Sequence, residues 1–181
     1  NQVYKQIYND IKSDSLNLAS IINLYKLRDT LMSRILYDSV PSIAYDTITN
    51  ENQIRFLYGI TLTTTFGKVF NTKKGYQLFK TFNSTETETD SLSFLIEDYY
   101  DQVLDSENDI ELVKSVTAKN IEVFQQKDWF LDFALKRRLN SSYLNYIKTS
   151  DDFKTRVFDY QIYAIQNYNR KLIRQQELAE T

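Results

Sequence analysis

The chain has 181 residues, of which 42% are hydrophobic and 25% charged, and its formal net charge is −2. These values fit one folded domain over residues 1–181, and the charge provides no general attraction to nucleic acid or anionic lipid. Histidine and cysteine are absent, which excludes serine–histidine and cysteine–histidine catalysis and the histidine ligands of di-metal helical bundles. With three glycines and one proline there are few helix breakers, so we expect an all-α fold and no cofactor.

The first expected element is one helix from Gln2 to about Asp38, a stretch without glycine or proline. Its apolar residues recur at gaps of three and four or their multiples, which is the pattern of one helix face. They are Val3, Ile7, Ile11, Leu18, Ile21, Ile22, Tyr25, Met32, Ile35 and Leu36. Polar residues, among them Asp10 and Asp14, are expected on the solvent face. At 1.5 Å per residue the stripe extends about 55 Å, which predicts an elongated bundle.

The second layer is expected to be interrupted. Residues 39–52 contain the only proline and are predicted to form a loop, followed by a helical stretch over about residues 51–64. The threonine run Thr61–Thr65 favours extended backbone, and Gly67 ends the helical pattern. A short helix is then predicted from about Thr72 to Phe82.

A third helix is predicted to begin at a cap formed by Thr89 or Asp90 and to end near Gln125. Its stripe is Leu92, Ile96, Tyr99, Val103, Ile110, Val113, Thr117 and Phe124. After a bend at residues 140–149, Ser150 or Asp151 is predicted to cap the last helix. Its stripe is Phe153, Val157, Tyr160, Ala164, Tyr168 and Leu172. The pattern therefore predicts an elongated antiparallel up-down-up-down bundle with kinked second and fourth layers.

Charge is distributed unevenly along the chain. Residues 86–111 contain aspartate and glutamate but no lysine or arginine, whereas the C-terminal part is richer in basic residues. We expect these oppositely charged helices to lie side by side, although each exposed ion pair contributes only about 0–1 kcal/mol.

Two sequence patterns resemble functional motifs, one a phosphate-binding loop and the other a pair of catalytic carboxylates. Residues Gly59–Lys68 end in Gly-Lys like a phosphate-binding loop, but seven residues separate the glycines instead of four and Val69 replaces the required Ser or Thr. Asp98, Asp101 and Asp105 share one helix face, and two carboxylates are enough for sugar hydrolysis, but nothing in the sequence marks a cleft around them. We therefore expect a protein that is not an enzyme and has no metal site.

An aromatic cluster near residue 130 is followed by basic residues and is the candidate interaction surface. Its members are Trp129, Phe130, Phe133, Arg137 and Arg138. Tryptophan and phenylalanine at a bend are typical interface anchors. The polar Thr61–Thr65 turn is a second candidate. The alternative is that the aromatic residues pack the end of the bundle. An exposed apolar patch around Trp129 favours binding, and full burial of this residue argues against it.

Three segments together resemble a known family. They are YNDIKSDSL at residues 8–16 with Ile21 and Ile22, TKKGYQLFKTF at residues 72–82, and DSLSFLIEDYY at residues 90–100. They are similar to the phrases LxDLxxD, GxYexLkssG and LrxxIxxYY of a bacterial family of uncharacterised single-pass membrane-anchored proteins, known only as a domain of unknown function. The resemblance covers about residues 4–125. The chain departs from the family at Phe82-Asn83 and in a longer, more acidic stretch at residues 84–88.

The resemblance implies a transmembrane anchor upstream of Asn1 and a soluble domain in the periplasm, held at the bacterial inner membrane. It implies no activity and no site residues. Our leading hypothesis is a non-enzymatic module that binds an unidentified protein or cell-envelope component and not nucleic acid. Whether it forms a homo-oligomer is left open. The alternative is the small-molecule sensor domain of a signalling receptor, with a pocket between helices that is lined by several tyrosines and has a charged residue at its base.

Overall fold

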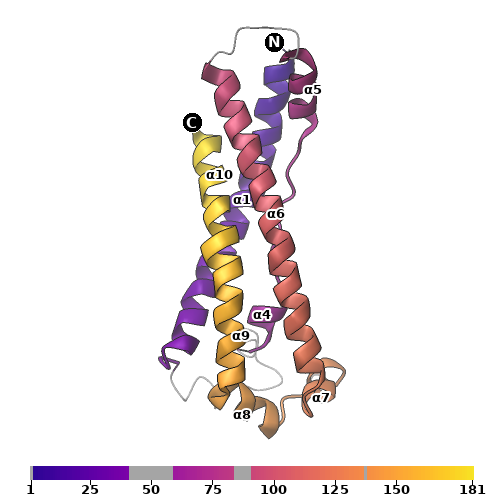
Figure 1. The fold of residues 1–181 in the computed structure, drawn as a ribbon, viewed down its shortest axis with the longest axis vertical. Helices are drawn as coiled ribbons and strands as arrows, with labels where there is room; N and C mark the ends of the chain where they lie inside the picture. The colour runs from indigo at the N-terminus through magenta and orange to yellow at the C-terminus, as the bar shows by residue number, and fades with distance from the viewer. Residues whose placement is uncertain (1, 41–58, 84–90, 137) are drawn as a thin grey trace.

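The computed structural model describes residues 2–40, 59–83, 91–136 and 138–181. Within these ranges every regular element is a helix, which confirms the all-α class. Three columns run along the molecule (Figure 1): α1 (Gln2–Leu36), α6 (Ser91–Gln125), and a continuous run of α9 (Asp151–Gln161), the π-helix η1 (Ile162–Asn169) and α10 (Arg170–Glu180). Helices α1 and α6 have 35 residues each, or about 52 Å. They run in the same direction, and the third column runs antiparallel to both.

The chain between α1 and α6 is not a fourth long helix in the described residues. It consists of the single turn α4 (Thr61–Thr64), an irregular segment at residues 65–73, and α5 (Lys74–Asn83), which forms where a short helix was predicted. The expected helix at residues 51–58 and the expected caps Thr89 and Asp90 lie outside the described residues. The four-layer up-down-up-down arrangement is therefore not confirmed.

Two short helices close the end of the bundle opposite the N-terminus of α1 (Figure 1): α7 (Phe130–Ala134) and α8 (Ser141–Thr149). The prediction of a bend at residues 140–149 was wrong, because Asn140 caps a true helix by accepting a hydrogen bond from a first-turn N–H (2.9 Å). Ser150 caps α9 in the same way, as predicted (3.3 Å).

The third column contains a π-helix of eight residues, η1, between α9 and α10. Its buried residues Tyr160, Ala164, Tyr168 and Leu172 are all at most 2% exposed and follow one another at steps of four. In an α-helix each such step advances about 40° beyond a full turn, so the stripe would drift off the core. The wider π-helix over residues 162–169 reduces this drift, because its hydrogen bonds join residues five apart.

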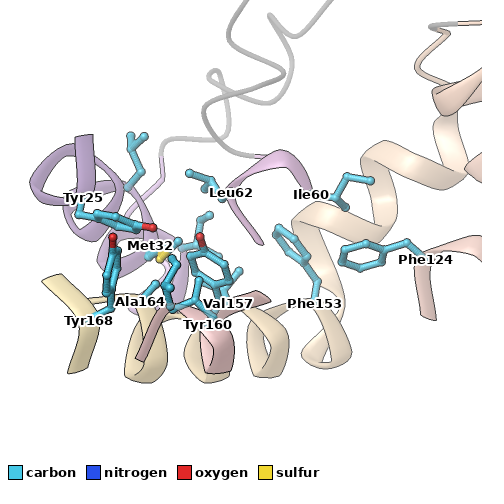
Figure 2. Close-up of a cluster of buried hydrophobic side chains, with 14 of the residues drawn as sticks. Tyr25, Met32, Ile60, Leu62, Phe124, Phe153, Val157, Tyr160, Ala164 and Tyr168 are labelled. Carbon is cyan, nitrogen blue, oxygen red and sulfur yellow. The ribbon is translucent and has the colours of Figure 1, made fainter. Parts of the chain in front are cut away.

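Buried tyrosines bind the irregular segment 65–73 to the bundle through its first residues. The pairs are Tyr160 hydroxyl to Thr65 carbonyl (2.6 Å), Tyr25 hydroxyl to both the carbonyl and the N–H of Gly67 (2.9 and 3.1 Å), and Val69 N–H to Tyr168 hydroxyl (3.2 Å). The bonded positions alternate, as extended backbone requires. Figure 2 shows the three rings among buried apolar side chains. Because an unpaired buried backbone group costs about 1–3 kcal/mol, these hydroxyls stabilise a segment that has no ladder of its own.

Burial also predicts how the fold responds to alkali. It raises the pKa of several tyrosines above the usual value of about 10, that of Tyr99 to about 12. The others are Tyr25, Tyr100, Tyr146, Tyr160 and Tyr168. Since the folded pKa exceeds the unfolded one, the stabilisation is complete below about pH 10 and is lost as the pH rises through the folded values. We expect tyrosinate absorbance and loss of the helical circular-dichroism signal to rise together above pH 10. Ionisation of all 14 tyrosines with an intact helical signal would contradict this.

Two carboxylates of α1 bind the start of α5. Asp14 accepts hydrogen bonds from the N–H and the hydroxyl of Thr72 (2.7 and 3.0 Å), and Asp10 accepts one from the N–H of Gly75 (2.7 Å). The prediction that Asp10 and Asp14 face solvent was wrong, because they are 3% and 2% exposed. The unpaired N–H groups of the first turn of a helix attract negative charge, which explains their position. Burial raises the pKa of Asp14 although the Thr72 hydrogen bonds lower it.

The core has two parts. The larger part joins α1, α4, α6, α8 and the third column. The smaller part lies near the N-terminus of α1 and contains Ile7, Phe79, Ile96, Tyr99, Tyr100 and Val103. The last turn of α10 packs against this smaller part through Leu178 and Ala179, which brings α1, α6 and the end of α10 together at one place.

Candidate binding groove

Trp129 packs the end of the bundle. It is 2% exposed, and its ring centroid lies 5.0 Å from that of Tyr143, 5.3 Å from that of Tyr146 and 6.0 Å from that of Phe124. A tryptophan with this degree of burial cannot serve as an exposed anchor for a partner. The structure therefore corrects the interpretation of Trp129 as a contact residue and supports the packing alternative.

The other members of the predicted surface are not gathered into a site. Phe130 and Phe133 are half-buried against the core, Arg138 is exposed, and Arg137 lies outside the described residues. The most exposed apolar side chains beside them are Leu131 (63%) and Leu135 (76%), which the sequence analysis did not single out.

The Thr61–Thr65 turn belongs mostly to the interior. Thr63 is fully buried and its carbonyl accepts a hydrogen bond from Asn120 (3.2 Å). The Thr65 carbonyl accepts the Tyr160 hydroxyl, and Arg28 also donates to it. These contacts give the turn a packing role.

The acidic residues of α6 face basic residues of α10, as the charge pattern predicts. Lys171 lies 3.2 Å from Asp109, and Arg174 lies 3.8 Å from Asp98. Across the described parts of the chain, no group of three or more acidic side chains is arranged to hold a metal ion. The carboxylates of this face thus take part in cross-helix pairing.

A groove lies where the first turns of α1 and α6 meet the end of α10, and it has a volume of about 590 Å³. Leu178 and Ala179 of α10 line it, and two matching apolar sets come from the long helices, one on each. These are Tyr4, Ile7, Tyr8 and Ile11 on α1, and Leu92, Leu95, Ile96 and Tyr99 on α6. Each set has the spacing i, i+3, i+4, i+7, which places all four side chains on one helix face.

The groove has a buried floor and an exposed rim. Ile7, Ile96 and Tyr99 are at most 5% exposed, whereas Tyr8 is 62% and Leu92 46% exposed. Apolar side chains on an exposed rim above a buried apolar floor are the usual composition of a binding site. The rim is therefore available to a ligand without rearrangement of the core.

Few polar groups face the groove. Lys12 and Ser15 come from α1, Gln176 and Glu180 come from α10, and Thr181 directly follows α10. The Tyr99 hydroxyl accepts a hydrogen bond from Gln175 (3.2 Å), and burial raises its pKa to about 12. The groove therefore offers one basic and one acidic side chain around a largely apolar surface.

Comparison with protein-family models, with curated proteins and with solved structures found no match. None of the described helices is long and apolar enough to cross a membrane. The sequence pattern assigned Ile7, Ile11, Leu92, Ile96 and Tyr99 to core stripes, but it could not show that these residues line a groove.

Proposed function

We propose that the chain is a non-catalytic binding domain and that the groove between α1, α6 and α10 holds its partner, a protein or a cell-envelope component. The observation that carries this proposal is the apolar wall of eight side chains at the rim and floor of the groove. Apolar pockets with a few polar groups, located between helices of a bundle, are typical ligand sites.

A second candidate function is the sensing of a small ligand. Three tyrosines line the groove, Tyr4, Tyr8 and Tyr99, and Lys12 and Glu180 lie at its edge. Its volume of about 590 Å³ is in the range of drug-sized ligand pockets, about 300–1,000 Å³. Both functions use the same surface, so both depend on the same rim residues.

We also propose that the domain is tethered at the bacterial inner membrane and lies in the periplasm. This proposal rests on the resemblance of residues 8–22, 72–82 and 90–100. The first turn of α1 and the last turn of α10 lie toward the same end of the bundle (Figure 1), so the groove would open toward the tethered end. Fractionation of cells that express the full-length protein, with recovery in the membrane fraction, is the expected result.

The binding proposal is tested with a neutral apolar dye such as Nile red. We expect saturable binding with increased fluorescence, and about tenfold weaker binding when Leu92 and Leu95 are both replaced by glutamine, because about 1.4 kcal/mol of apolar contact is lost. Both leucines are exposed by at least 39%, so the variant should fold as the parent does.

The matched control replaces Leu104 and Leu112 by glutamine. These leucines are 53% and 47% exposed on the same helix but do not line the groove, and the control should bind the dye like the parent. Absence of dye binding, or equal loss in both variants, would contradict the proposed site.

A further inference from the structure

The segment that joins α4 to α5 is an extended stretch that runs along the bundle (Figure 1). Gly67 is hydrogen-bonded to Tyr25 of α1, and Thr72 is hydrogen-bonded to Asp14 of the same helix. Five residues of the segment therefore pass eleven residues of α1, which rise about 16 Å. This corresponds to about 3.3 Å for each residue of the segment, which is the rise of a β-strand.

One edge of this extended stretch is bonded to the bundle and the other edge is free. Tyrosine hydroxyls bind its backbone at the alternate positions 65, 67 and 69. In extended backbone, the N–H and C=O groups of neighbouring residues point to opposite sides. Those of Phe66, Lys68 and Phe70 therefore point away from the tyrosines, and within the described residues they make no hydrogen bond.

The side chains beside the free edge are two aromatic rings and one positive charge. Phe66 is 38% and Phe70 72% exposed, and Lys68 between them is half-buried. The Lys68 ammonium lies 5.7 Å from the centre of the Phe70 ring and makes no ion pair with any described residue. The free backbone groups are thus bordered by apolar surface and by a cation that has no acidic partner.

We propose that residues 66–70 bind an extended segment of a partner protein, which pairs with this edge as a neighbouring β-strand. Pairing along an exposed edge is a general mode of peptide recognition, in which the backbone provides affinity and alternate side chains provide specificity. The matching segment has an acidic residue opposite Lys68 and an apolar residue two positions to each side, opposite Phe66 and Phe70. A helix does not fit this edge, because its N–H and C=O groups are bonded within the helix.

The charge of Lys68 argues against a second copy of this chain as the occupant. Two copies paired in antiparallel orientation about Lys68 would bring their ammonium groups opposite each other, and like charges at opposed positions destabilise a sheet. Lysine on an edge strand is also one way in which proteins prevent strands from pairing with their own kind. A partner strand with an acidic residue at this position gains an attraction instead.

The test uses a fluorescein-labelled peptide with the sequence Val-Thr-Glu-Thr-Val, extended by one threonine at each end, and a peptide of the same composition in scrambled order. Fluorescence anisotropy measures binding to the domain. We expect the alternating peptide to bind at least about fivefold more tightly than the scrambled one, because only the alternating order places the glutamate and both valines opposite residues 66, 68 and 70.

Two N-methylated forms of the alternating peptide show whether its backbone pairs with the domain. In an added strand the N–H of the glutamate faces the edge, whereas the N–H of the next threonine points away. Methylation of the glutamate nitrogen should abolish binding, and methylation of the threonine nitrogen should leave it within about twofold of the parent peptide. Equal affinities of the two methylated peptides, or no binding of the unmethylated one, would overturn the inference.

Lys68→Glu should weaken binding of the alternating peptide about tenfold, and a peptide with lysine in place of glutamate should recover it. Lys5→Glu is the matched control, because Lys5 is exposed near the N-terminus of α1, and its binding should be unchanged. Equal binding by the Lys68→Glu variant and the parent would overturn the inference.

The edge is separate from the groove, since residues 66–70 do not line it. The Leu92→Gln/Leu95→Gln variant should therefore bind the alternating peptide as the parent domain does. Loss of peptide binding in that variant, with unchanged binding by Lys68→Glu, would place the peptide in the groove. The strand inference would then fall and the proposed function would stand.

Discussion

Replacing Gly75 by alanine is expected to destabilise the domain by about 2 kcal/mol. A Cβ atom at Gly75 would lie 2.7 Å from the backbone N and 2.9 Å from the Cα of Ile7, so α5 and α1 would have to move apart. Overpacking typically costs about 1–3 kcal/mol and sometimes more. The better helix propensity of alanine offsets about 1 kcal/mol of this cost. The steric term should dominate because two of the three nearest atoms belong to the backbone, which cannot rotate away.

Gly67→Ala is the matched control. A Cβ there would meet the tips of Ile21 and Leu24 at 3.0 and 3.1 Å, and such flexible side-chain ends can shift. We expect the free energy of unfolding to change by less than about 1 kcal/mol. Alanine lowers the conformational entropy of the unfolded chain, and this gain offsets the cost of the close contact. Urea unfolding of both variants measures the difference. A Gly75→Ala domain as stable as the parent would show that α1 and α5 do not approach as closely as described.

Replacing Tyr25 by phenylalanine is expected to destabilise the domain by about 2–3 kcal/mol. The ring would stay in its fully buried place, but both the N–H and the carbonyl of Gly67 would lose their hydroxyl partner. A buried polar group without a partner costs about 1–3 kcal/mol. Two fully buried groups would together cost twice that range. The expected destabilisation is smaller because Gly67 is half-buried and water can reach part of it.

Tyr37→Phe is the matched control for this change, since Tyr37 is 82% exposed, and its effect should stay within about 0.5 kcal/mol. Tyr168→Phe should resemble Tyr25→Phe, because the Val69 N–H would lose its partner. Thermal unfolding of the three variants compares them. Equal stability of Tyr25→Phe and Tyr37→Phe would mean that tyrosine hydroxyls do not hold residues 65–69.

The long helices could be predicted because their information is local. The stripe from Val3 to Leu36 specifies α1, and the stripes that begin at Leu92 and Phe153 specify α6 and the third column. Each needs only the recurrence of apolar residues at gaps of three and four. The Ser150 cap and the helix near residues 72–82 were predictable for the same reason.

The second layer could not be predicted because its partners are distant in sequence. Residues 65–69 depend on hydroxyls of Tyr25, Tyr160 and Tyr168, which are separated from them by 42 to 99 residues. Asp10 and Asp14 were assigned to solvent because carboxylates are rarely buried alone. Only their contact with the start of α5 explains the burial.

The burial of Trp129 could not be predicted for a related reason. Trp129 attracts attention in the sequence because aromatic residues beside basic ones are typical of interfaces, but its neighbours Tyr143 and Tyr146 cover it. The groove forms where α1, α6 and α10 meet, and the placement of these helices beside one another depends on loop lengths and packing. Periodicity within a helix contains no information about them.

The central claim, that the groove is where this domain binds, is tested most directly by two-dimensional NMR of the labelled domain titrated with Nile red. We predict amide shifts clustered at residues 4–15, 92–99 and 176–181. Shifts centred instead on α7, around the exposed Leu131 and Leu135, or spread evenly over the bundle, would contradict the account.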